Sequence, residues 1–221
     1  MLLLFAPAAD AQSAFDARMG KFATVLQGHI ANRDCETVIG EGGFELLWNF
    51  LQIRAALQRS DDDRLYETTQ KDPRFTALKY PDCKQDQKPV VAKARATAKK
   101  LVKEVGGQPY EVDVFNLYLR NEFPRLVWGY GLERVCRQLS RAMRPDFFAF
   151  YHMVATAIDR RGVEDMPFPE DIVDEAASSV SSADCGPEIR ARIGESAKDV
   201  REIARHLGIW SNRTGTIRKQ P

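Results

Sequence analysis

The chain carries its densest aromatic run between Phe115 and Ile158, which reads FNLYLRNEFPRLVWGYGLERVCRQLSRAMRPDFFAFYHMVATAI. Nine of the protein's twenty-one aromatic residues lie between Phe115 and Tyr151, and aliphatic residues fill most of the positions between them. Burying even half of these side chains would contribute roughly 1.5 to 3 kcal/mol each. We therefore expect this run to form the centre of a hydrophobic core that neighbouring helices cover.

Length and composition place the chain among ordinary globular proteins. It has 221 residues, of which 44% are hydrophobic and 29% are charged, so a chain disordered throughout is excluded. This length allows one compact domain or two small ones. The formal net charge of +1 provides no overall electrostatic reason to expect binding to nucleic acid.

Apolar residues recur at spacings of three and four along most of the chain, which is the period of an amphipathic helix. Only the segment 110–119 also fits a strand, and we interpret it as helical because no other segment offers a partner strand. The sequence thus predicts an all-α protein, a single-domain irregular bundle of about six to eight helices over residues 12–208. The expected helices span residues 12–32, 44–59, 90–105, 110–123, 125–143, 147–160, 172–180 and 189–207.

Several residues are expected to interrupt these helices. The acidic run at residues 60–63 either ends the second helix or begins a short separate one. Pro124 is expected to start a new helix, because proline is favoured in the first helical turn. Gly129 and Gly131 are expected to weaken the helix that follows.

The first eleven residues, MLLLFAPAADA, resemble the back half of a secretory signal peptide. A short apolar run is followed by a small-x-small cleavage site, while the basic front end is missing, so we expect the start Met to lie inside a longer precursor. The alternative is an apolar N-terminus of a cytosolic protein. The apolar run is too short to span a membrane, so we expect no transmembrane segment. Residues 209–221 are expected to form a flexible basic tail.

The four cysteines favour export and disulfide formation. They show no C-x-x-C pattern and no neighbouring histidine, so disulfides in an oxidising compartment are preferred to a metal site. Consecutive pairing, Cys35 with Cys83 and Cys136 with Cys185, closes two loops of similar length and is our prediction. Four buried free thiols are the alternative.

A weak internal repeat is visible. Each of two apolar helices is followed at a similar distance by an Asp-Cys pair, Asp82-Cys83 or Asp184-Cys185. Any two buried helices share part of such a pattern, so duplication stays one of two interpretations. The aligned positions are Leu47, Phe50, Ile53, Ala56 and Leu57 with Phe148, Tyr151, Val154, Ala157 and Ile158.

No motif in the chain identifies a chemistry. Glu41 lies between glycines at the start of a buried helix, where a partly desolvated carboxyl could protonate a glycosidic oxygen. A solvated carboxylate at a helix start is the other interpretation. His29, His152 and His206 show no metal-ligand spacing, so we expect no metal and no cofactor, and His29 is interpreted as a core or interface residue.

The strongest local bias is electrostatic. Residues 71–103 contain ten basic residues and three acidic ones. On the helix over residues 90–105 this bias predicts a basic face for an anionic partner, although a solvated helix face has the same pattern. The candidate binding residues are Lys93, Arg95, Lys99, Lys100 and Lys103.

These patterns predict an exported protein, periplasmic or secreted, without catalytic activity. It would act as an accessory protein that binds an envelope protein or an anionic envelope polymer through a helical surface, with no nucleic acid as partner. One alternative is an enzyme that cleaves cell-wall glycan with Glu41 as general acid. A further alternative is a helical carrier of an apolar ligand within the aromatic core.

Overall fold

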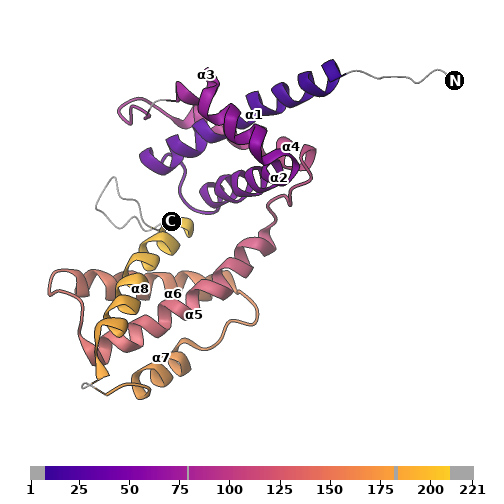
Figure 1. Ribbon diagram of the computed structural model, residues 1–221. Helices are drawn as coiled ribbons and strands as arrows, with labels where there is room; N and C mark the ends of the chain where they lie inside the picture. The colour runs from indigo at the N-terminus through magenta and orange to yellow at the C-terminus, as the bar shows by residue number, and fades with distance from the viewer. Residues whose placement is uncertain (1–7, 79, 182–183, 210–221) are drawn as a thin grey trace. The chain divides into compact units, whose positions relative to one another are not determined.

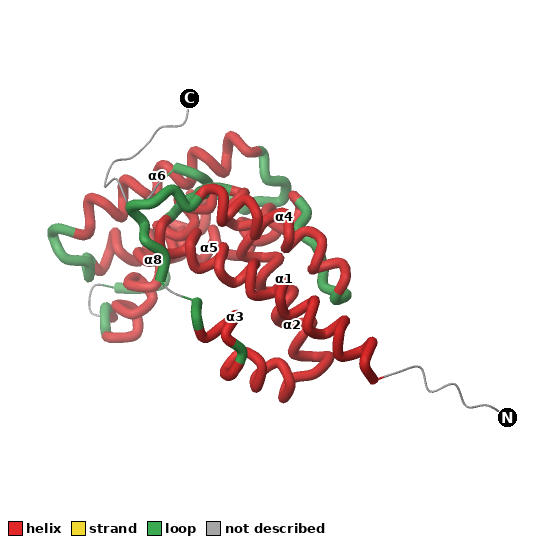
Figure 2. The backbone as a smooth tube through the Cα atoms, turned by 90° about the horizontal axis from the view of Figure 1, so that it is seen from above, coloured by secondary structure: helices red, strands yellow, loops and turns green. Residues whose placement is uncertain are grey.

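The structure is a computed structural model, and it describes residues 8–78, 80–181 and 184–209. Eight α-helices lie in these ranges and no strand does; Figure 2 shows helices joined by loops. The predicted all-α class is confirmed. No helix in the described ranges combines the length and the apolar character that crossing a membrane requires. Residues 1–7 and 210–221 lie outside the described ranges, so the signal remnant and the basic tail stay predictions.

The described residues form two compact units, where one domain over residues 12–208 was expected. The first unit comprises the described residues up to Val38 together with Gly42–Tyr110. The second comprises Ile39–Glu41 and the chain from Glu111 onward. The division has a physical basis, because each unit has aromatic residues of its own to bury.

The first unit contains α1 (Ala8–Cys35), α2 (Glu41–Lys71), the single-turn α3 (Pro73–Thr76) and α4 (Lys88–Glu104) (Figure 1). The first residue of α2, Glu41, belongs to the second unit, as do the two residues before it, Ile39 and Gly40. The core of the first unit is made by buried side chains of α1, α2 and α4, which include Phe22, Phe50 and Leu101.

The second unit contains α5 (Val112–Cys136), α6 (Met143–Arg161), α7 (Pro169–Ser178) and α8 (Pro187–His206) (Figure 1). Helix α5 packs against each of the other three. The aromatic run supplies this core as expected, and five of its rings are at most 7% exposed, namely Phe115, Phe123, Phe147, Phe150 and Tyr151.

Two expected helix interruptions are wrong. Helix α2 continues through residues 60–63, with Leu57 and Leu65 buried on either side of the acidic run. Helix α5 contains Pro124 in its interior, with Phe123 and Leu126 each 1% exposed. A proline inside a helix costs about 3 kcal/mol. Burial of two such side chains, at roughly 1.5 to 3 kcal/mol each, offsets that cost.

Each unit holds one disulfide, and the predicted pairing is confirmed. Cys35 is bonded to Cys83 and Cys136 to Cys185, with Cα atoms 5.2 and 5.4 Å apart. In both units the bond joins the last residue of the first helix to the segment that precedes the last helix.

The two units share their core packing, at positions related by one constant sequence offset. In the first unit the rings of Phe22 and Phe50 stack with centroids 5.9 Å apart and planes 2° apart. In the second, Phe123 and Tyr151 stack with centroids 6.5 Å apart and planes 10° apart. The alignment of Phe50 with Tyr151 seen in the sequence is therefore also an alignment of contacts.

The turn after the first helix is also shared. The residue after the helix-ending cysteine is left-handed in both units, Glu36 at φ 47° and Arg137 at φ 50°. These are strained positions for residues other than glycine, and such conformations persist only where the surroundings hold them. The left-handed residue thus follows the helix-ending cysteine in both units, after Cys35 and after Cys136, so the two turns share this backbone conformation.

A side chain from the first helix closes each of these turns. In the first unit Asn32 Oδ1 accepts a hydrogen bond from the Val38 N–H at 2.7 Å. In the second, Glu133 Oε2 accepts one from the Leu139 N–H at 3.1 Å. Glu133 is fully buried, and its charge is balanced by Arg144 Nε at 2.7 Å from Oε1.

The first and last helices of each unit cross at a glycine. A Cβ on Gly28 of α1 would lie 2.0 Å from the Cβ of Ala94 on α4. A Cβ on Gly129 of α5 would lie 2.3 Å from the Cβ of Ser196 on α8. Gly129 is thus no weak point of its helix, because only glycine permits this approach.

Replacing Gly129 with alanine is expected to destabilise the protein by about 1 to 3 kcal/mol, because α5 and α8 must move apart. Gly194→Ala is the matched control, since nothing lies within 4 Å of a Cβ built there on α8. We expect that control to stabilise the protein by about 0.5 to 1 kcal/mol. Urea unfolding measures both, and equal effects of the two substitutions would contradict the close crossing.

Removing the second disulfide with the pair Cys136→Ser and Cys185→Ser is expected to lower the free energy of unfolding by about 2 to 4 kcal/mol. The reason is that the open chain gains loop entropy when it unfolds. Urea unfolding of this variant and of the oxidised wild type measures the difference. Peptide mapping without reductant gives an independent check, and recovery of Cys136 as a free thiol would refute the assignment.

Candidate functional site

The orientation of the basic helix follows from its apolar positions. Val91, Ala94, Ala98 and Leu101 on α4 are fully buried in the core of the first unit. Because these positions recur at three and four residues, the positions between them face away from the core. The cationic side chains of α4 are thereby placed on its outer face.

The structure separates the five predicted binding residues into two groups. Arg95 and Lys99 both contact the buried Glu45 of α2, Arg95 through Nη2 and Lys99 through Nζ at 2.8 Å. These two cations hold α4 against α2 and are not available as a pair to another anion. Lys93, Lys100 and Lys103 are exposed, and none has a carboxylate partner in the described part of the chain.

We call Lys93, Lys100 and Lys103 the lysine stripe. Positions 93, 100 and 103 are spaced by seven and three residues, so the three side chains lie along one side of α4. Sequence reasoning identified this side but could not divide the five cations, because Glu45 lies fifty positions away from Arg95.

Glu45 is a buried carboxylate with two cationic partners. Burial raises the pKa of Glu45. Hydrogen bonds from Lys99 and Arg95, together with the charges of these two residues, lower the pKa by more than burial raises it, so the net shift is downward. A carboxyl group whose pKa is lowered in the folded state stabilises the fold at pH values above the pKa that the group has in the unfolded chain. That contribution is lost as the pH falls through the folded pKa.

Glu45→Gln is expected to reduce stability at pH 7 by roughly 1 to 3 kcal/mol, since hydrogen bonds to charged groups have this strength. The stabilities of variant and wild type should converge as the pH falls below the ordinary glutamate value of 4.5. Thermal unfolding between pH 3 and pH 7 tests this with about ten buffers. A difference that does not change with pH would show that the charge of Glu45 contributes nothing.

Glu41, the candidate general acid, lies in the first turn of α2. Its Oε2 is 3.2 Å from Nη1 of Arg161, which also donates to Asn116 Oδ1 through Nε at 2.8 Å. The catalytic role of Glu41 stays a prediction.

The histidines contact aromatic and acidic groups. His29 is half-buried and stacks on Phe50 with centroids 4.5 Å apart. His206 is buried, with Nε2 3.6 Å from Oε1 of Glu202 and its ring against the edge of Tyr118. Within residues 8–78, 80–181 and 184–209, no group of three or more His, Cys, Asp or Glu residues could hold a metal ion.

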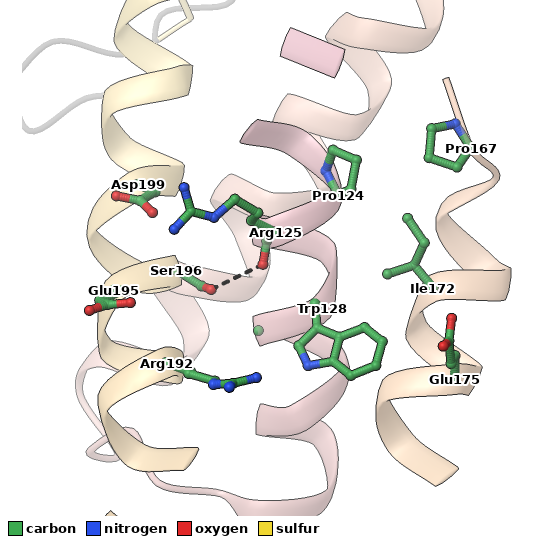
Figure 3. A pocket seen from close by; sticks show the side chains of 11 residues that line it. Pro124, Arg125, Trp128, Pro167, Ile172, Glu175, Arg192, Glu195, Ser196 and Asp199 are labelled. Atoms are coloured by element: carbon green, nitrogen blue, oxygen red, sulfur yellow. Dashed lines mark hydrogen bonds between the residues drawn. The ribbon is translucent and has the colours of Figure 1, made fainter. Parts of the chain in front are cut away.

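A cleft of about 670 Å³ opens in the second unit between α5, α7 and α8 (Figure 3). Its apolar side consists of Pro124 and Trp128 from α5, Pro167 from the connector and Ile172 from α7. Trp128 is only half buried, and its indole ring projects into the space between the helices. The cleft therefore offers a flat aromatic surface to a ligand.

Charged side chains surround this apolar side. Helix α8 provides Arg192, Glu195 and Asp199, α7 provides Glu175, and α5 provides Arg125 (Figure 3). With three carboxylates and two guanidinium groups, the rim carries more negative than positive groups. The rim thus presents hydrogen-bond donors and acceptors together.

The surroundings of the rim carboxyl Asp199 shift its pKa. Its pKa is raised first by burial and then by the nearby carboxylates of Glu122 and Glu202, while Arg125 opposes the shift. Ionisable groups with perturbed pKa values in clefts are frequent at functional sites. The raised pKa of Asp199 therefore makes this cleft a candidate site.

The sequence does not reveal this cleft, because Trp128 belongs to the aromatic run that predicts a core. Trp128 stands beside Val127, which is fully buried, and composition cannot separate the two. The available signal was the set of charges at Arg192, Glu195 and Asp199, which recur at three and four positions on one side of α8. Only the packing of α8 on α5 connects those charges with Trp128.

Comparison of the chain with protein-family models, with curated proteins and with solved structures finds no match. The lysine stripe of α4 and the cleft beside Trp128 are therefore judged by their own geometry and chemistry.

Proposed function

We propose that the protein is an exported, non-catalytic accessory protein that binds an anionic macromolecule of the cell envelope through the lysine stripe of α4. The observation that carries this proposal is the division among the cations of α4. Arg95 and Lys99 have an internal partner in Glu45, while Lys93, Lys100 and Lys103 are exposed without one in the described ranges. Three such lysines on one side of a rigid helix form a surface for anions.

Export is supported by the disulfides. Bonds such as Cys35–Cys83 and Cys136–Cys185 form and persist in oxidising compartments and are rare in the cytosol. The signal-like character of residues 1–11 agrees with this location. Periplasmic or secreted localisation is thus part of the proposal.

The strength of the interaction limits the kind of partner. A lysine near an anionic surface contributes roughly 1 kcal/mol, so three lysines alone give weak binding. Repeated weak contacts become strong when the partner carries many anionic groups. An acidic polymer, or an envelope protein with an extended acidic surface, therefore fits better than a small anion.

Reversing the lysine stripe with Lys93→Glu, Lys100→Glu and Lys103→Glu is expected to weaken binding to isolated envelope fragments by about tenfold or more. The salt dependence of the remaining binding should flatten, because fewer counterions are exchanged. Cosedimentation at several salt concentrations measures both effects.

The matched control is Arg134→Glu, Arg141→Glu and Lys198→Glu, which makes the same change in net charge at exposed positions of the second unit. Wild-type binding by the control with loss in the stripe variant would support the lysine stripe. Equal loss in both variants would show that net charge alone matters, and undiminished binding in the stripe variant would remove the proposed surface.

A further inference from the structure

The first unit provides an internal comparison for the cleft of the second. The residue before the crossing glycine is Gln27 on α1 and Trp128 on α5. The same helix crossing, Gly28 on Ala94 or Gly129 on Ser196, thus forms with or without an indole beside it. The helix crossing itself therefore does not require Trp128.

The helices that face these glycines, α4 in the first unit and α8 in the second, also differ in their side chains beside the crossing. On α4 the residues one before and three after Ala94 are Lys93 and Thr97. On α8 the residues one before and three after Ser196 are Glu195 and Asp199. At these positions the second unit has two carboxylates where the first has one lysine and one neutral residue, and both carboxylates line the cleft.

The rim does not favour an anionic ligand. Arg125 lies 3.4 Å from Glu122, and Arg192 lies 3.2 Å from Glu188, so both guanidinium charges are partly compensated by carboxylates outside the rim. Glu175, Glu195 and Asp199 therefore leave a negative balance beside the aromatic surface. Carboxylates accept hydrogen bonds and Arg192 donates them, so this rim suits a ligand rich in hydroxyl groups.

We propose that the cleft beside Trp128 binds a sugar unit of a neutral glycan. One face of a pyranose ring is a patch of C–H groups, which packs on the indole. The hydroxyl groups at its edge donate to Glu195 and Asp199 and accept from Arg192. A volume of about 670 Å³ accommodates a short oligosaccharide and lies within the range of small-molecule sites.

This site goes beyond the proposed function of the lysine stripe and does not depend on it. The cleft is made only by residues of the second unit, and the stripe lies on α4 of the first. A protein with both surfaces would hold an anionic partner on one unit and a glycan on the other. Either surface can be removed by substitution without changing the other.

The test is calorimetric titration of the full-length protein with the trisaccharides chitotriose and cellotriose. We expect saturable binding of one of them with a Kd of about 1 mM or tighter. Trp128→Ala should weaken it about tenfold, since it removes the packing surface, while Trp128→Phe keeps an aromatic ring and should retain part of the affinity. Gln27→Ala, at the equivalent position of the first unit, should bind as the wild type does.

The rim is tested by Asp199→Asn and Glu195→Gln, which keep side-chain shape and remove the charged acceptors. Each should weaken binding about five- to tenfold, because hydrogen bonds to charged groups are the stronger ones. Failure of both trisaccharides to bind at about 10 mM, or undiminished binding by Trp128→Ala, would overturn the proposal. Tighter binding of trilysine than of either sugar, lost in Trp128→Ala, would also overturn it and assign the cleft to a cationic side chain.

Discussion

The close crossing of the first and last helices is the constraint on which each unit depends. At Gly28 and at Gly129 the backbones approach so nearly that a single methyl group would collide with the facing helix. A disulfide then joins the end of the first helix to the segment before the last, at Cys35–Cys83 and Cys136–Cys185. The two helices are thus held by contact at their crossing and by a covalent bond near their ends.

This arrangement separates the parts that make the fold from the parts open to function. The buried sides of α4 and α8 fill equivalent places in the two cores. Their outer sides differ, with Lys93 and Lys100 on α4 and Glu195 and Asp199 on α8. Since the same crossing forms under both sets of side chains, the charges are not required for folding. The differences between the units therefore coincide with the two surfaces for which binding is proposed.

Local signals predicted helix existence well and helix interruption poorly. Periodic apolar residues located the described helices longer than one turn, because burial of an amphipathic face stabilises such helices. Pro124 and the acidic run at residues 60–63 predict interruptions, because each disfavours a helix locally. Buried neighbours such as Phe123 and Leu65 offset those costs, and their contacts come from residues distant in the chain.

The sequence by itself determined the helical class and the basic character of α4, because periodicity and charge are properties of neighbouring residues. It also favoured the disulfide pairing that the structure confirms. Only the tertiary structure decided that there are two units with one arrangement, that Glu45 engages Arg95 and Lys99, and that Trp128 lines a cleft. Each of these depends on side chains brought together from separate helices. Such contacts are determined by packing, and the local pattern of a helix does not contain them.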